Sequence, residues 1–164
     1  MLIVPTVRLA LPSDARGIAE FSRDYIEHGL SWSWNRDRIL KAIRDTATNV
    51  AVVNERDGIP GFGIMQYGET TAHLCLLGVQ PTLQCRGLGR ALLSWLECCA
   101  VTAGIECVKV EARADNPRAI AFYEKRGFKV EARVPGYYCG IIDAVRLRKR
   151  LTVGSDRAGK LPGV

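Results

Sequence analysis

The hydrophobic pattern of the first third of the chain predicts one strand followed by two helices. Apolar and polar residues alternate over residues 7–11, which is the period of a half-buried strand. Residues 12–27 begin with turn and capping residues and continue with an amphipathic pattern, which predicts a helix. Asn35 is a favourable capping residue for a second helix. The apolar face of that helix contains Ile39, Leu40 and Ile43.

Three β-rich runs follow in the middle of the chain. They cover residues 49–55, 61–67 and 71–79. The short segments between them, residues 56–58 and 68–70, contain glycine with charged or hydroxyl side chains and are good turn sequences. The pattern therefore predicts an antiparallel meander of three strands.

The next segment has the spacing of a helix with one buried stripe. Its apolar residues recur at steps of three and four, and we expect this helix to begin at Arg86 and to end near Gly104. The stripe consists of Leu88, Ala91, Leu92, Trp95, Leu96 and Cys99. Residues 107–111 then alternate as a strand.

The last regular elements are one more helix and two strands. Residues 116–127 begin with an asparagine cap and a proline at the first helical position, which predicts a helix. Two extended runs, residues 128–134 and 138–151, are predicted to form strands joined by a turn at residues 135–136.

This order of elements, β-α-α-β-β-β-α-β-α-β-β, predicts an α+β fold: a mixed, mostly antiparallel central sheet flanked by helices. We expect a single domain over residues 1–151, because 164 residues fit one ordinary hydrophobic core. Residues 152–164 are rich in glycine and polar residues, and we expect them to form a flexible basic tail.

Composition and charge exclude several classes of protein. Hydrophobic residues make up 48% of the chain and charged residues 24%, which is typical of a globular protein rather than a disordered or membrane protein. No secretory signal or membrane-length apolar run is visible, so we expect a cytoplasmic location. The formal net charge is +6, but residues 146–164 carry most of the excess. We therefore expect a solvated basic end rather than a nucleic-acid binding face.

The cysteines argue against a metal site. There are six of them, no two in a CxxC pair, and only two histidines are available to assist. Most lie in apolar runs, where a thiol is ordinarily a small buried hydrophobe. Cys85 is the exception, because it lies in a loop beside two arginines that favour its thiolate.

A glycine pair lies at the predicted junction between the third meander strand and the next helix. Gly87 and Gly89 allow a tight turn whose backbone N–H groups suit a phosphate, and Arg86 and Arg90 add positive charge. The third glycine of a dinucleotide fingerprint is absent, because Leu92 occupies that position. From these residues alone, an ordinary strand-to-helix turn remains an open alternative.

Read with its surroundings, this segment resembles the GNAT superfamily of N-acyltransferases. Gln84, Gly87 and Gly89 match the family signature Q/R-x-x-G-x-G/A, and the family's preceding strand and proline are also present. Residues 116–119 and 122–128 match a second conserved block of the family. The resemblance is clear over residues 71–148.

The resemblance implies a cofactor site for acetyl-CoA as cosubstrate. In the family, the fourth strand carries a bulge and diverges from the fifth, so that unpaired backbone groups bind the pantetheine arm and polarise the thioester. The matching strand positions are Leu77, Gly78 and Val79. The matching pyrophosphate loop is Gln84, Cys85, Arg86, Gly87, Leu88, Gly89 and Arg90. Asn116 and Tyr123 match the remaining positions that contact the cofactor.

Two residues match the chemistry of acetyl transfer. Tyr123 corresponds to the family's usual general acid. The alternative interpretation of this residue is a packed aromatic side chain beside Phe122. Glu111 is placed at a strand end and is a candidate general base, acting directly or through water. The alternative interpretation of Glu111 is an ordinary surface carboxylate.

The implied activity is an N-acetyltransferase in which a primary amine attacks acetyl-CoA directly in a ternary complex. Glu111, Arg113 and Tyr123 further resemble the branch that acetylates protein N-termini, including the ribosomal-protein alanine type. An acetyltransferase of a small-molecule amine and a nonenzymatic acyl-CoA sensor remain alternatives. The chain is expected to act as a monomer or homodimer. The family's acceptor site implies Trp32, Trp34, Tyr137 and Tyr138 as substrate-binding residues, although these aromatics could equally be core.

Overall fold

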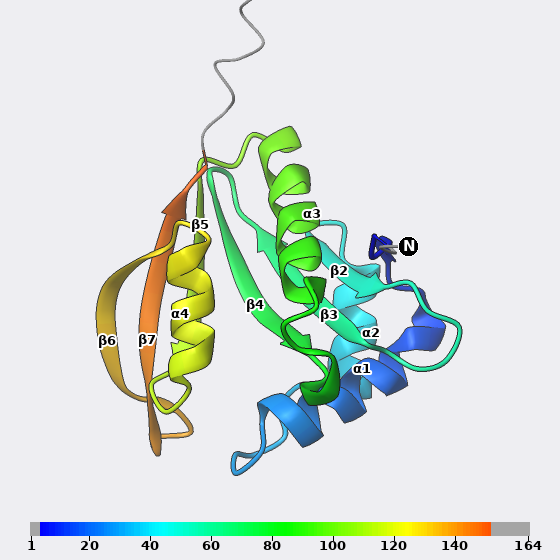
Figure 1. The fold of residues 1–164 in the computed structure, drawn as a ribbon, viewed down its shortest axis with the longest axis horizontal. Helices are drawn as coiled ribbons and strands as arrows, with labels where there is room; N and C mark the ends of the chain where they lie inside the picture. Colours follow the sequence, from blue (N-terminus) through cyan, green and yellow to red (C-terminus); the bar gives the residue numbers. More distant parts are fainter. Residues whose placement is uncertain (1–3, 152–164) are drawn as a thin grey trace, which may run out of the picture.

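The computed structural model describes residues 4–151, and its order of helices and strands agrees with the predicted order. The elements are β1 (Val7–Leu9), α1 (Ala15–Phe21), α2 (Arg36–Arg44), β2 (Thr48–Val53), β3 (Gly61–Tyr67), β4 (Thr71–Val79), α3 (Leu88–Thr102), β5 (Cys107–Arg113), α4 (Pro117–Lys125), β6 (Lys129–Tyr138) and β7 (Ile142–Arg150) (Figure 1). The predicted tail, residues 152–164, lies outside the described residues.

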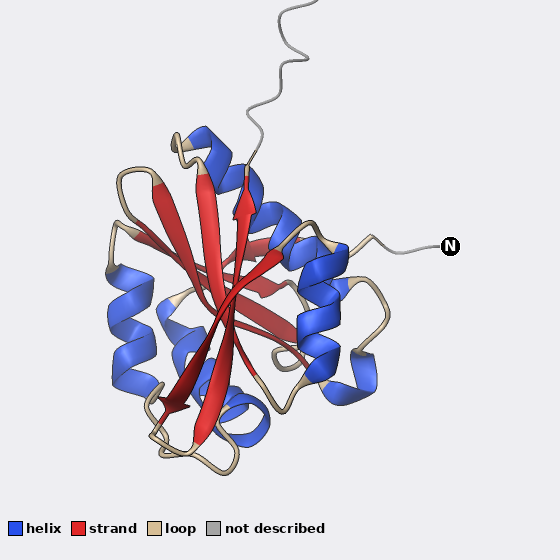
Figure 2. Cartoon of the chain, turned by 90° about the vertical axis from the view of Figure 1, so that its left-hand side faces the viewer, coloured by secondary structure: helices blue, strands red, loops and turns tan. Residues whose placement is uncertain are grey.

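The strands form one seven-stranded sheet in the order β1-β2-β3-β4-β5-β7-β6. The β4–β5 pair is parallel, and the other neighbouring pairs are antiparallel, so the predicted mixed, mostly antiparallel sheet is confirmed. Figure 2 shows helices on both sides of this twisted sheet.

Each face of the sheet has its own hydrophobic core, and β2 contributes to both. Val50 and Val52 face the cluster formed with α1 and α2, whereas Ala51 and Val53 face the cluster formed with α3 and α4. This is the alternation of side chains that a strand buried on both faces requires. The helices on the two faces hold the centre of the sheet in place.

The parallel pair in the middle of the sheet separates halfway along its length. Paired positions run only from Thr71 opposite Cys107 to Leu74 opposite Val110. The register of β4 on β3 also shifts at this point, leaving Cys75 as the bulged residue. The expected bulge and divergence of the fourth strand are thus confirmed, and Figure 1 shows β4 and β5 spreading apart toward one end.

The helix boundaries differ from prediction in two places. The helix expected to begin at Arg86 begins at Leu88, after a left-handed Gly87 that cannot belong to a right-handed helix. The turn expected at residues 12–14 is a 3-10 turn, Pro12–Asp14, and the single helix expected after it, to about residue 27, is divided into α1 and a π turn at Ser22–Ile26.

The turn of the last hairpin was also predicted at the wrong residues. The structure places the reversal after Tyr138, which pairs with Ile142, so β6 continues through residues 135–136 and β7 begins at residue 142. Two glycines explain the difference, since both are left-handed: Gly136 gives an irregularity within β6, and Gly140 makes the turn.

The basic residues near the end of the chain are part of the sheet rather than of a tail. Arg146, Arg148, Lys149 and Arg150 all belong to β7. These residues lie in the strand predicted over residues 138–151, which pairs with both β5 and β6, and Arg148 and Arg150 are exposed to solvent. No helix among residues 4–151 has the length and hydrophobicity needed to cross a membrane.

Candidate active site

The divergence of β4 and β5 opens a large cavity of about 1420 Å³. Its walls come from the second half of β4, the loop before α3, the segment between α1 and α2, the exposed side of α4 and the tip of the β6–β7 hairpin. Small-molecule sites commonly occupy about 300–1,000 Å³, so this space is large enough for a long cosubstrate together with part of a second molecule.

The loop before α3 presents backbone N–H groups to this cavity. Gly87 has φ of 83° and Cys85 has φ of 64°, so the chain turns sharply into the helix. The first backbone hydrogen bond of α3 runs from the N–H of Ala91 to the carbonyl of Gly87. The N–H groups of Leu88 and Gly89 precede that bond and have no acceptor within the helix, which is the arrangement that suits a phosphate.

The residues predicted for the pyrophosphate loop do not all reach the cavity. Gln84, Cys85, Gly87, Leu88, Gly89 and Arg90 line it, whereas Arg86 is not among the lining residues. The side chain of Gln84 donates a hydrogen bond to the carbonyl of Val79 at 3.3 Å, which ties the loop to the end of β4. Gln84 therefore fixes the position of the loop.

The wall formed by β4 is made of backbone where the strand has lost its partner. Leu77, Gly78 and Val79 line the cavity as predicted, and they lie beyond the last paired position with β5. A Cβ atom at Gly78 would come within 2.7 Å of Cε1 of Phe21, so only glycine fits here without displacing α1. The strand thus offers unpaired polar groups along a groove of fixed width.

Helix α4 completes the side of the cavity opposite the loop. The carboxamide oxygen of Asn116 accepts a hydrogen bond from the N–H of Ala119 at 3.2 Å and caps α4, so this oxygen is occupied by the helix itself. Asn116 still lines the cavity. Its amide nitrogen remains the group that can be offered to a cosubstrate.

Tyr123 is both a packed aromatic side chain and a cavity residue. It is 6% exposed and makes edge-to-face contacts with Phe122 and Phe128. Burial, and then the nearby Tyr138, raise the pKa of its phenol, which therefore stays protonated at neutral pH. Within residues 4–151 its hydroxyl has no hydrogen-bond partner, and the residue lines the cavity. The hydroxyl is thus available to a group in the cavity.

Glu111 lies within β5 rather than at a strand end or on an open surface, which corrects the predicted position. Its side chain is 10% exposed and is held between two cations. His73 Nε2 lies 2.5 Å from one carboxylate oxygen and Arg146 Nε lies 3.1 Å from the other. Burial opposes ionisation of Glu111, but these two partners outweigh it and lower the pKa of the carboxyl.

His73 is the centre of a small polar cluster on β4. Its hydrogen bonds to Cys75, at 3.7 Å from Nδ1 to Sγ, and to Glu111 raise its pKa to about 10. The imidazole is therefore charged at neutral pH, and it lines the cavity together with Cys75 and Glu111. The cluster lies where β4 and β5 begin to separate.

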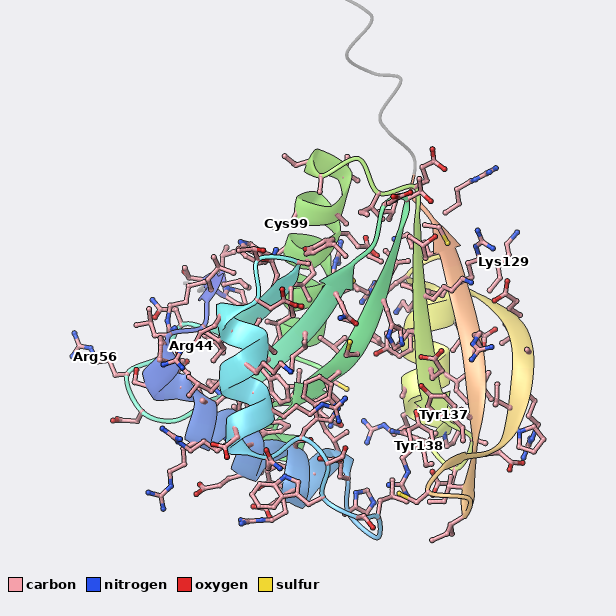
Figure 3. All side chains as sticks on the ribbon, turned by 180° about the vertical axis from the view of Figure 1, so that it is seen from behind. Arg44, Arg56, Cys99, Lys129, Tyr137 and Tyr138 are labelled. Atoms are coloured by element: carbon pink, nitrogen blue, oxygen red, sulfur yellow. The ribbon has the colours of Figure 1, made fainter. Side chains whose placement is uncertain are left out.

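Three of the four aromatics predicted for the acceptor site line the cavity: Trp34, Tyr137 and Tyr138. The Tyr138 hydroxyl donates a hydrogen bond to the backbone oxygen of Glu111 at 3.1 Å. Trp32 is not among the lining residues, and its indole N–H donates to the backbone oxygen of Trp34. Tyr137 and Tyr138 lie at the same end of the hairpin, beside the gap between the two halves of the sheet (Figure 3).

The match to a family model decides the assignment of the whole chain. The model for the acetyltransferase (GNAT) domain covers residues 46–130, which contain β4, the phosphate-type loop, Glu111 and Tyr123. The chain belongs to the GNAT family of acetyltransferases. The predicted family is therefore confirmed by a match over more than half of the chain.

Individual relatives of this GNAT domain give a consistent picture. A curated relative is ribosomal protein bS18-alanine N-acetyltransferase of Salmonella typhimurium, 39% identical over 82 residues, which are 50% of this chain and 55% of that protein. The match thus spans about half the length of that relative. A solved structure, Ard1 of Thermoplasma volcanium, has 25% identity and a TM-score of 0.78 over 92% of this chain and 99% of that chain.

A second solved structure bears on the cosubstrate. The acetyltransferase yncA of Salmonella typhimurium, described with its cofactor acetyl-CoA, has 22% identity and a TM-score of 0.76 over 93% of this chain and 97% of that chain. At this level of identity the likeness shows a shared fold.

Two features of this GNAT cavity were missed from the sequence. Neither His73 nor Glu27 was predicted as a site residue, yet both line the cavity. The carboxylate of Glu27 is buried and accepts hydrogen bonds from the Ser22 hydroxyl at 2.9 Å and from the N–H groups of Ser33 and Trp34 at 2.9 and 3.2 Å. The strand register places His73 opposite Lys109 of β5. Lys109 lies two residues before Glu111, so the two side chains are on the same face of the strand.

Arg113 connects the two sides of the cavity and was also missed. Its guanidinium donates to the backbone oxygens of Ile26 and His28, at 3.3 and 2.9 Å, and pairs with Asp115 at 2.9 Å. One side chain from β5 thereby holds the segment after α1 against the opposite half of the sheet. Its exposed fraction of 12% indicates a fixed position rather than a mobile one.

Proposed function

We propose that this protein transfers an acetyl group from acetyl-CoA to the terminal amine of a protein or peptide, by direct attack of the amine on the thioester. The observation that carries this proposal is the arrangement around the diverging strands. A backbone-lined wall at Leu77 to Val79 and a phosphate-type loop lie in the same cavity as a protonated phenol, Tyr123, and a carboxylate, Glu111. The bS18-alanine N-acetyltransferase among the relatives supports an N-terminal acceptor.

The cosubstrate would lie along β4 with its pyrophosphate at the start of α3. The free N–H groups at Leu88 and Gly89 would bind the phosphates, and the unpaired groups of Gly78 and its neighbours would bind the pantetheine arm. Backbone donors aimed at a thioester oxygen stabilise the charge that develops during attack, by about 3 kcal/mol for a well-placed donor.

The proton transfers would be divided between two residues. When the amine nitrogen forms its bond to the carbonyl carbon, the bond to sulfur breaks, and the Tyr123 hydroxyl donates a proton to the leaving thiolate. The amine must lose a proton before or during attack. Both carboxylate oxygens of Glu111 are already hydrogen-bonded, so Glu111 would receive that proton through a water molecule rather than directly.

The test is thiol release from acetyl-CoA in the presence of different amines. The panel contains peptides with free N-termini, lysine-bearing peptides with blocked N-termini, polyamines and aminoglycosides, and mass spectrometry locates the acetyl group on each product. The proposal expects turnover with free N-termini and acetylation of the α-amine. Turnover with polyamines or aminoglycosides alone would instead establish a small-molecule acetyltransferase. Binding of acetyl-CoA without turnover of any amine would establish a sensor.

Two variants test the assigned roles. Tyr123→Phe is expected to lower kcat by about 10²- to 10⁴-fold with a much smaller effect on the affinity for acetyl-CoA, because the ring stays in the cavity wall and the donated proton is lost. Glu111→Gln is expected to lower kcat at neutral pH, with partial recovery at higher pH where more of the acceptor amine is already neutral. Undiminished turnover in both variants would show that the residues are wrongly assigned.

A further inference from the structure

A second cavity of about 410 Å³ adjoins the candidate active site on the same face of the sheet. Three residues line both cavities: Gln66, His73 and Glu111. The second cavity continues onto Lys109 and Arg146, on β5 and β7. It therefore begins at the carboxylate assigned to the acceptor amine and extends away from the cosubstrate loop.

The charge of this second cavity is positive. Lys109, Arg146 and the charged His73 line it against one carboxylate, Glu111, whose two oxygens are already bound by His73 and Arg146. Among residues 4–151, Lys109 has no acidic side chain within 4 Å. At least one cation, the ammonium group of Lys109, is therefore available to a ligand in this cavity.

The strand register extends this positive charge across the sheet. Lys109 is opposite Arg148 on β7, and Arg148 is opposite Lys129 on β6, so the three side chains share one face. Glu131 lies 3.6 Å from Arg148 and offsets part of the charge there. Figure 3 shows α1 and α2 in front of the other half of the sheet, whereas no helix of the described chain lies in front of β5, β7 and β6.

We propose that this second cavity binds a carboxylate side chain within the first few residues of the acceptor peptide. The proposal rests on the proposed peptide acceptor and adds its chemical class: an N-terminal segment with aspartate or glutamate shortly after the acetylated residue. An extended peptide advances about 3.3 Å per residue, so a peptide whose amine lies near Glu111 reaches the cavity within its next residues. A carboxylate there would pair with Lys109, whose charge is not balanced by an acidic side chain of the described residues within 4 Å.

The test compares peptides that share their first residue and differ only in whether residues two to four are acidic, amide-bearing or basic. The acidic series is expected to have a kcat/KM about tenfold higher than the amide series, a difference that one such ion pair can supply. The preference should shrink as salt concentration rises, because the cavity is open to solvent.

The most direct test of the proposed subsite is a variant in which the charge of one residue is reversed. Lys109→Glu is expected to abolish the preference for acidic peptides and to raise kcat/KM for basic ones, while leaving kcat for the amide series unchanged. Arg56→Glu is the matched control, since it changes the charge equally but lies at the opposite side of the molecule (Figure 3). Equal kcat/KM for the three wild-type series, or equal effects of the two variants, would overturn the inference and leave the proposed function intact.

A binding measurement separates the inference from the proposed function. Fluorescently labelled peptides with acetylated N-termini cannot react, and their dissociation constants are measured by anisotropy for the wild type and for Lys109→Glu. Tighter binding of the acidic peptide by the wild type alone supports the subsite even if no free peptide is turned over. Equal binding of acidic and amide-bearing peptides overturns it. Retention of RNA that is lost in Lys109→Glu, with no peptide preference, would identify a nucleic-acid surface instead.

Discussion

The two walls of the cavity in this GNAT domain are built from different parts of the polypeptide. The wall formed by β4 and residues 84–90 presents mainly backbone groups, placed by glycines and by the loss of a strand partner. The wall formed by β5 and β7 presents side chains, which are held by one another through Glu111 and its partners.

This difference determines how each wall tolerates change. A backbone wall keeps its groups under most substitutions and is sensitive where a side chain would fill the groove or force the strand to move. A side-chain wall depends on the identity and charge of each member, because removing one partner leaves another buried and unpaired. Substitutions in the two walls should therefore differ in the size of their effect and in which of the two substrates they affect.

The largest effect is expected from Gly78→Val in the backbone wall. The new Cβ would lie 2.7 Å from Cε1 of Phe21 and 3.0 Å from Cδ1 of Ile26, so these two side chains, or the segments that carry them, must shift. Overpacking of this kind costs about 1–3 kcal/mol of unfolding free energy. We expect a lower thermal midpoint by differential scanning calorimetry and weaker acetyl-CoA binding by isothermal titration calorimetry.

Gly89→Ala is the matched control for that substitution. Its Cβ would lie 3.4 Å from Cζ of Phe122, which is ordinary contact, so the thermal midpoint should change little. If Gly78→Val had the stability and acetyl-CoA affinity of the wild type, this would contradict the expectation that the backbone wall is sensitive to added side-chain volume.

A somewhat smaller effect is expected from Glu27→Gln on the acceptor side. The amide would place a donor among the hydrogen-bond donors Ser22, Ser33 and Trp34, so part of this hydrogen-bonding pattern would be lost. We expect KM for the acceptor to rise and KM for acetyl-CoA to stay the same in steady-state kinetics. Glu20→Gln, an exposed control, should change neither constant.

The contrast between the walls also explains what the sequence could predict. The elements of the backbone wall were predicted from hydrophobic periodicity and glycine spacing, which are local properties, whereas its role as a cofactor wall came from the family resemblance. The position of Gly87 and Gly89 at the strand-to-helix junction is one example, although the helix began two residues later than expected, at Leu88. The bulge in the fourth strand followed from the family resemblance and was confirmed at Cys75.

The side-chain wall was predicted only in part, because it depends on the strand register. Glu111, predicted as a general base, lines the cavity, but its partners His73 and Arg146 are separated from it by 38 and 35 positions. No local pattern indicates such pairs. The sequence predicted the strand that carries the basic residues of β7, but not their common face with Lys109, because that face exists only once β5 and β7 are paired.

A pH-dependent effect is expected from His73→Asn. The folded-state pKa of about 10 lies above the ordinary value of 6.5. The charged imidazole therefore stabilises the fold fully below about pH 6.5, and this contribution is lost as the pH rises through about 10. Thermal midpoints of the wild type and His73→Asn should differ most near pH 6 and converge by a few degrees toward pH 10.

Cys75→Ala provides a second test of the charge assigned to His73. The hydrogen bond to Cys75 is the largest cause of the raised pKa of His73, with Glu111 second. Removing the thiol should lower the His73 pKa, so that the stabilising contribution is lost at a lower pH than in the wild type. A difference between wild type and His73→Asn that stays constant from pH 6 to pH 10 would contradict the assigned charge.

The smallest effect is expected from Tyr138→Phe, which removes one hydrogen bond from the side-chain wall. The hydroxyl of Tyr138 donates to the backbone oxygen of Glu111, and such a bond contributes about 0.5–1.5 kcal/mol to stability. We expect the thermal midpoint to fall by roughly 2–4 °C per kcal/mol lost. Tyr137→Phe, at the adjacent and more exposed ring, serves as the control and should leave the midpoint unchanged. Equal midpoints for the two variants would mean that the hydrogen bond to β5 does not help to hold the hairpin against the cavity.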